Sequence, residues 1–183
     1  DYDMCLKSGI VDAVYIGLPN NMHYDFTVRA AEAGIHVLCE KPMAMNEWEC
    51  VKMIQVAGKN NIKLMIAYRL HFEEGNLKAI EWAQSGRLGD IRIFNSTFTM
   101  DVLPGNSRLD RDVAGGPLYD IGIYCINAAR GIFRDEPVEV SAFGVKGWQQ
   151  RFREVDEMTS AILRFPKDRL AVFASRNPLK PPR

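Results

Sequence analysis

The sequence predicts an α/β protein in which the second half of a doubly wound parallel sheet precedes an α+β region with an open, mostly antiparallel sheet. Two observations predict this order. Short apolar runs alternate with amphipathic helical segments up to about residue 70. Beyond that point, strand patterns follow one another with only two helical segments among them. We therefore expect two domains, residues 1–70 and 71–183.

Three apolar runs in the first domain have the length and composition of buried parallel strands, at residues 12–17, 35–40 and 63–68. A helix separates the first two runs. Either Asn20 or Asn21 can cap its start, and Gly34 is placed to end it. Strands and helices in this order form two βαβ units, which is half of a doubly wound sheet.

The second helix of this domain is expected over residues 47–60, with Asn46 as its N-cap. Val51, Ile54 and Gly58 recur at helical spacing and are predicted to line its inner face.

The second domain is predicted to contain helices over residues 73–85 and 118–133, and strands over 91–100, 137–145, 158–165 and 169–175. The last three strands are expected to be antiparallel, with Pro166, Lys167 and Asp168 forming a tight connection. The tail 176–183 is rich in proline and basic residues, which indicates a disordered terminus or a truncated sheet.

Composition excludes several classes of protein. Lys plus Arg and Asp plus Glu number 23 each, so no basic field marks a nucleic-acid binder. No apolar run approaches the ~18–20 residues of a membrane helix, and we expect neither membrane partner nor signal peptide. The four cysteines fit neither a zinc site nor a redox pair, which predicts reduced thiols, a cytoplasmic location and no metal. Because the chain starts with Asp, we take it to be a fragment or a processed product.

The triplet Glu40-Lys41-Pro42 follows the second expected strand directly. Open α/β sheets bind ligands at the carboxyl ends of their strands, so this position favours a role for Lys41 in chemistry. A partly buried lysine exchanges protons readily. Glu40 can pair with its ammonium. The alternative is an ordinary surface lysine in a loop, and the placement after a buried strand leaves the two interpretations about even.

A second group of polar residues lies on the helix predicted over 118–133. Asp120, Tyr124 and Asn127 are at positions i, i+4 and i+7, so they share one face, opposite an apolar one. A tyrosine hydroxyl near a carboxylate can relay a proton. The alternative is a solvated helix face. The upstream Gly115-Gly116 pair favours function, because it permits a close backbone approach.

Asn20 and His23 lie at the start of the first helix, where polar ligand groups bind helix N-termini. The alternative makes Asn20 a cap and His23 a surface residue. Glycine-rich dinucleotide motifs, P-loops and Gly-x-Ser-x-Gly elbows are all missing from this sequence.

In combination these motifs resemble the glucose–fructose oxidoreductase/inositol dehydrogenase (Gfo/Idh/MocA) family over residues 12–145. The resemblance rests on Leu18-Pro19-Asn20 with His23, on Glu40-Lys41-Pro42, on Tyr68-Arg69, and on the run from Gly115 to Tyr124. It implies an N-terminal Rossmann domain that binds NAD(P), and a C-terminal α/β domain whose open sheet forms a homo-oligomer. Relative to that pattern, the chain is truncated at both ends: the strand, glycine-rich turn and helix that open the Rossmann domain are missing.

The resemblance also implies roles for individual residues. Lys41, Asp120 and Tyr124 match catalytic positions, in which Tyr124 exchanges the hydroxyl proton, Lys41 assists it and orients the oxygen, and Asp120 holds a neighbouring hydroxyl. Tyr124 replaces the histidine of many members, which favours the aldose-type branch and, with it, NADP over NAD. The cofactor-side positions are Leu18, Pro19, Asn20, His23, Glu40, Lys41, Pro42 and Arg69.

The function expected on this basis is hydride transfer between nicotinamide and a sugar or polyol. Two alternatives stay open: an inactive remnant that acts as a self-associating module, and a lyase or glycosidase that uses bound nicotinamide without net turnover.

Overall fold

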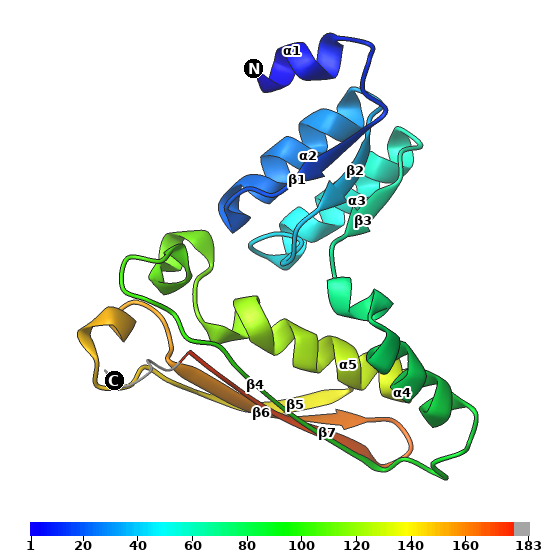
Figure 1. The fold of residues 1–183 in the computed structure, drawn as a ribbon, viewed down its shortest axis with the longest axis vertical. Helices are drawn as coiled ribbons and strands as arrows, with labels where there is room; N and C mark the ends of the chain where they lie inside the picture. Colours follow the sequence, from blue (N-terminus) through cyan, green and yellow to red (C-terminus); the bar gives the residue numbers. More distant parts are fainter. Residues whose placement is uncertain (178–183) are drawn as a thin grey trace. The chain divides into compact units, whose positions relative to one another are not determined.

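The computed structural model describes residues 1–177 and divides them into two compact units. The first unit contains residues 1–68 together with the segment Asp112–Ala114, and the second contains Arg69–Arg111 and the residues from Gly115 onward. Each unit has its own sheet (Figure 1). Each unit also has its own cluster of buried hydrophobic residues.

The first unit is built on three parallel strands in the order β1-β2-β3, namely β1 (Ala13–Ile16), β2 (His36–Cys39) and β3 (Leu64–Ile66). The register pairs Ile16 with Cys39, and Cys39 with Ile66. All three strands therefore end level at one edge. The predicted half of a doubly wound sheet is confirmed.

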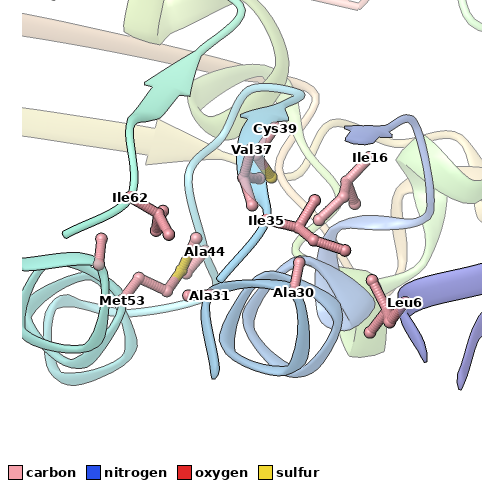
Figure 2. Packing of buried hydrophobic residues seen from close by; sticks show 11 residues of the cluster. Leu6, Ile16, Ala30, Ala31, Ile35, Val37, Cys39, Ala44, Met53 and Ile62 are labelled. Carbon is pink, nitrogen blue, oxygen red and sulfur yellow. The ribbon is translucent and has the colours of Figure 1, made fainter. Parts of the chain in front are cut away.

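Helices pack on one face of this sheet: α2 (His23–Glu32) and α3 (Glu47–Lys59), with the short α1 (Tyr2–Lys7) at the chain's start. The buried strand residues Ile16, Val37 and Cys39 point toward Ala30 and Ala31 of α2 and toward Met53 of α3 (Figure 2). Small alanines allow α2 to approach the sheet closely.

The sequence predicted both the N-cap and the inner face of α3. Asn46 caps α3 as expected, since its Oδ1 accepts a hydrogen bond from Glu49 N at 3.0 Å.

The predicted inner face of α3 is wrong. Val51 and Ile54 are 43% and 60% exposed, and Met53 and Ala57 are buried instead. The adaptable Met and the small Ala fill the gap to the sheet, and residues 51 and 54 lie on other sides of the helix.

The second unit has a four-stranded sheet in the order β4-β7-β6-β5, which pairs antiparallel except for β4 with β7. The strands are β4 (Ile93–Thr99), β5 (Glu139–Val145), β6 (Met158–Phe165) and β7 (Arg169–Arg176). The turn between β6 and β7 places Lys167 and Asp168 at positive φ, as a tight hairpin requires. The predicted open, mostly antiparallel sheet is confirmed.

One face of that sheet is covered by α5 (Ile123–Phe133), which lies along it, and α4 (Glu74–Gln84) contacts α5 (Figure 1). Cys125, Ala129 and Phe133 of α5 pack on Leu163 and Phe173 of the strands. The apolar side predicted for this helix is therefore buried. The helix predicted from residue 118, however, starts with a π-helical segment, Leu118–Gly122. Of the predicted tail 176–183, Arg176 still belongs to β7 and Asn177 is buried, so the strand runs one residue further than expected. Residues 178–183 lie outside the described residues.

Candidate functional site

The loops that follow β1 and β2 leave the sheet at the same edge, because the two strands are parallel and end in register. The last backbone hydrogen bond between β1 and β2 runs from Glu40 N to Ile16 O, at 2.9 Å. Beyond that hydrogen bond lie residues 17–22 on one side and 40–46 on the other. These loops contain most of the cofactor-side residues that the sequence predicts.

His23 connects the two loops. It is the first residue of α2 and is fully buried. Its Nδ1 lies 2.7 Å from Pro42 O, and its Nε2 lies 2.9 Å from Leu18 O. The alternative in which His23 is a surface residue is therefore wrong, because the helix start turns its ring inward between the two loops.

Asn20 contacts a third segment of the same unit. Its Nδ2 donates to Val113 O at 2.9 Å, within the segment Asp112–Ala114. Asn20 does not cap α2 as the sequence suggested. A 3-10 turn, Asn20–Met22, precedes the helix, so Met22 takes the N-cap position without a side-chain hydrogen bond.

Glu40 is held by a residue that the sequence analysis missed. The Tyr15 hydroxyl donates to Glu40 Oε1 at 2.7 Å, and Lys41 N donates to Oε2 at 3.2 Å. The hydrogen bond from Tyr15 to the carboxylate raises the pKa of the Tyr15 phenol, because ionisation would place two negative charges together. The alternation of β1 could have indicated Tyr15, since it directs this ring to the face opposite Ile16.

The chemistry of this edge fits a nicotinamide cofactor. Leu18 is half-buried and Pro19 is exposed, so each leaves apolar surface of the kind that suits a planar ring. Lys41 is half-buried beside the buried Pro42 and provides a cation, and the amide of Asn20 provides a polar group. Arg69 is exposed and starts the 3-10 turn Arg69–Phe72 of the second unit.

In the second unit, Asp120 lies in the π-helical segment and pairs with Arg108. Arg108 Nε donates to Asp120 Oδ2 at 2.7 Å, and the Asp120 side chain is only 10% exposed. A π-helical turn inside a helix is often found at functional sites. Arg108 was not predicted, because it precedes Asp120 by 12 residues in a loop without periodic pattern.

Gly115 and Gly116 hold the loop that contains Arg108. Gly115 N donates to Asp110 O, and Gly116 N donates to Arg108 O, each at 2.8 Å. A Cβ at Gly115 would lie 2.5 Å from Asp110 O and 2.6 Å from Arg108 O. The close backbone approach expected from this glycine pair is therefore present, and its partner is the loop of residues 108–110.

The other polar residues of this helix contact separate segments. Tyr124 is half-buried, and its ring centroid lies 5.7 Å from that of Phe98 on β4. Asn127 Nδ2 lies 3.2 Å from His71 Nε2. Asp120 and Tyr124 thus belong to the second unit, whereas Lys41 belongs to the first.

All four cysteines are free thiols. Burial raises the pKa of Cys39 to about 11, and burial also raises the pKa of Cys125. These two thiols are therefore poor nucleophiles. Among residues 1–177, no group of three potential metal ligands gathers, and no helix is long and apolar enough to cross a bilayer.

Comparison with known proteins agrees with this geometry. Residues 1–68 match the family model described as "Oxidoreductase family, NAD-binding Rossmann fold", and residues 76–178 match "GFO/IDH/MocA C-terminal domain". The crystal structure of aldose-aldose oxidoreductase from Caulobacter crescentus complexed with glycerol superposes with a TM-score of 0.91 at 40% identity, covering 98% of this chain and 54% of that one.

Two curated relatives are similar over most of the chain. An uncharacterized oxidoreductase of Rhizobium meliloti is 37% identical over 94% of this chain and 51% of its own length. D-xylose 1-dehydrogenase [NADP(+)] of Haloarcula marismortui is 35% identical over 93% of this chain and 49% of its own length. The chain thus spans about half the length of the curated relatives it matches.

The Gly115 contact predicts a measurable cost for any side chain there. We expect Gly115→Ala to lower the free energy of unfolding by about 1–3 kcal/mol, since backbone atoms must move to admit the methyl group. Chemical denaturation measures this change. Gly58→Ala is the matched control: it meets open space within α3 and should stabilise slightly. Equal stability of the Gly115 variant and the unaltered protein would contradict the contact.

The Tyr15–Glu40 contact predicts a pH effect. Because the carboxylate raises the pKa of the Tyr15 phenol above its ordinary value of 10.0, Glu40→Gln should let Tyr15 ionise at lower pH. Ultraviolet titration of tyrosinate, with Tyr15→Phe to assign the transition, measures the shift. An unchanged Tyr15 transition in Glu40→Gln would show that the pair does not form.

Proposed function

The chain belongs to the GFO/IDH/MocA family of oxidoreductases, and we propose from this premise that the protein transfers hydride between NAD(P) and a carbon of a sugar or polyol. The observation that supports this most strongly is the convergence of residues 18–20 and 40–42 at the carboxyl edge of a parallel sheet. Open sheets of this type bind nucleotides at that edge.

Residues of the first unit would hold the cofactor. In this proposal Leu18 and Pro19 contact the nicotinamide ring, and Asn20 supplies a polar contact. Glu40 keeps the strand end in place through Tyr15, so that Lys41 and Pro42 face the ligand. Arg69 adds a cation on the cofactor side. A bound nicotinamide supplies the hydride acceptor or donor, which no side chain can replace.

Residues of the second unit would act on the substrate. Tyr124 exchanges the proton of the reacting hydroxyl, with Lys41 orienting that oxygen. Asp120 accepts a hydrogen bond from a neighbouring hydroxyl, and the ion pair with Arg108 holds its carboxylate in position. A half-buried tyrosine beside Phe98 has limited rotational freedom, which suits a group that must meet one oxygen.

The names of two relatives support a finer proposal for substrate and cofactor. The Haloarcula marismortui relative is named as a D-xylose 1-dehydrogenase that uses NADP(+), and the Caulobacter crescentus structure as an aldose-aldose oxidoreductase. We therefore propose an aldose as substrate and NADP as cofactor. The free, weakly acidic thiols support a reducing, cytoplasmic location.

We also propose that the protein forms a homo-oligomer through the open face of its second sheet. We define the open face as the strand residues turned away from α5. The large apolar members are Ile93, Phe143, Val145, Met158, Ile162 and Leu170, with Phe143 78% exposed. An apolar area of this kind on a regular, flat surface is typical of protein interfaces.

The proposed reaction predicts the effect of removing the tyrosine hydroxyl. Tyr124→Phe should reduce the rate of aldose-dependent NADP⁺ reduction by about 10²–10⁴-fold, with cofactor affinity unchanged, because only proton exchange is lost. Nicotinamide fluorescence measures both quantities. Tyr24→Phe, which removes a hydroxyl next to Trp48 in the first unit, is the control. Full activity of Tyr124→Phe would reject the role of Tyr124 in proton exchange. Absence of turnover in the unaltered protein would favour the alternative that the protein is a catalytically inactive remnant.

The proposed interface predicts that a charge on the open face dissociates the oligomer. Phe143→Asp should convert an oligomer into a monomer, because an unpaired carboxylate would be buried at the interface. Phe72→Asp makes the same change at another exposed position outside the sheet, and should leave the oligomer intact. Analytical ultracentrifugation measures the oligomeric state of both variants. A monomeric unaltered protein at micromolar concentration would exclude this interface.

A further inference from the structure

The contacts of His23 differ from those of a residue that touches a ligand. Its ring is fully buried, and both ring nitrogens face backbone carbonyl oxygens, at 2.7 Å for Pro42 and 2.9 Å for Leu18. Carbonyl oxygens only accept hydrogen bonds, so a ring nitrogen stabilises each contact when it donates. Neither nitrogen faces solvent or an open pocket. His23 therefore has no polar atom left for a cofactor.

The two carbonyl groups belong to loops that the sheet does not otherwise join. Leu18 lies two residues beyond the end of β1, and Pro42 lies three residues beyond the end of β2. The strand ladder stops at the hydrogen bond from Glu40 N to Ile16 O. His23 thus joins the loop after β1 to the loop after β2, beyond the last hydrogen bond between the two strands.

A rigid ring is suited to this task. The imidazole presents two nitrogens in fixed directions, one toward each loop carbonyl, and a nitrogen that carries a proton donates a hydrogen bond to the carbonyl that it faces. Because α2 supplies the ring from its first residue, the position of the ring is fixed by the helix and the buried cluster behind it. Loops at sheet edges are otherwise among the more mobile parts of a fold.

We propose that His23 is a positioning residue that fixes the separation of the loop after β1 from the loop after β2, and so shapes the cofactor edge before any ligand binds. The nature of that ligand rests on the proposed function, whereas the loop connection does not. A preorganised edge binds more tightly than one that must be ordered on binding. The chemical contacts with the cofactor remain with residues 18–20 and 41, and His23 acts through them.

The test compares His23→Phe and His23→Gln with Thr27→Ala in the full chain. Thr27 lies one helical turn further along α2 and is also fully buried, but its hydroxyl makes no hydrogen bond to either loop carbonyl. Hydrogen exchange is measured at the amides of Met22 and Lys41, which lie in the two loops, relative to Val37 and Leu38 within β2. NADPH affinity is measured on the same samples by nicotinamide fluorescence.

We expect His23→Phe to speed exchange at Met22 and Lys41 at least about tenfold relative to β2, and to weaken NADPH binding about tenfold, as loss of a buried hydrogen bond would. His23→Gln, which retains one donor, should fall between His23→Phe and the unaltered protein. Thr27→Ala should lower the melting temperature without changing amide exchange at Met22 or Lys41. If His23→Phe proves too unstable to measure, His23→Gln against Thr27→Ala answers the same question.

Three results separate the claims. Equal loop exchange in the His23 and Thr27 variants, at similar loss of stability, would overturn the positioning role, even where the unaltered protein binds NADPH. Faster loop exchange in the His23 variants, with no NADPH binding by the unaltered protein, would support the loop connection and reject the proposed function. Faster exchange together with weaker binding supports both.

Discussion

The parallel pairing of β1, β2 and β3 is the constraint on which the rest of the first unit depends. Because the register places Ile16, Cys39 and Ile66 level with one another, the segments after all three strands leave from one edge. An antiparallel pairing of the same strands would send residues 18–20 and 40–42 to opposite edges. Burial of Ile16, Val37 and Cys39 against α2 and α3 stabilises this register, since a slip of one residue would expose them.

In the second unit, backbone contacts fix the positions of the polar side chains. Gly115 and Gly116 both donate hydrogen bonds to the loop of residues 108–110, and at Gly115 the approach leaves no room for a side chain. The loop held in this way includes Arg108, which pairs with the Asp120 carboxylate. The π-helical segment then passes into α5, whose buried side fixes Tyr124 next to Phe98. The first unit therefore positions its polar groups through strand register and the side chains of His23 and Tyr15, whereas the second unit does so through close backbone packing at Gly115.

The sequence predicted the elements whose signals are local. The apolar strand runs, the Asn46 cap and the tight turn at Lys167 and Asp168 follow from short-range patterns, and the structure confirms them. It missed features that depend on distant partners: Asn20 bonds to Val113, and Arg108 pairs with Asp120. The inner face of α3 was predicted wrongly because Val51 and Ile54 are more apolar than Ala57, although packing against the sheet favours the smaller residue.

The central claim is that the carboxyl edge of the first sheet is the cofactor edge, and amide chemical shifts during NADPH titration test it most directly. We expect the largest shift changes on residues 17–22 and 40–46, with the strand interiors of both sheets nearly unchanged. Lys63, which directly precedes β3 at the opposite edge of the same sheet, serves as an internal reference. Changes concentrated around Lys63 or on β5, or saturating NADPH with no change at the two loops, would contradict it.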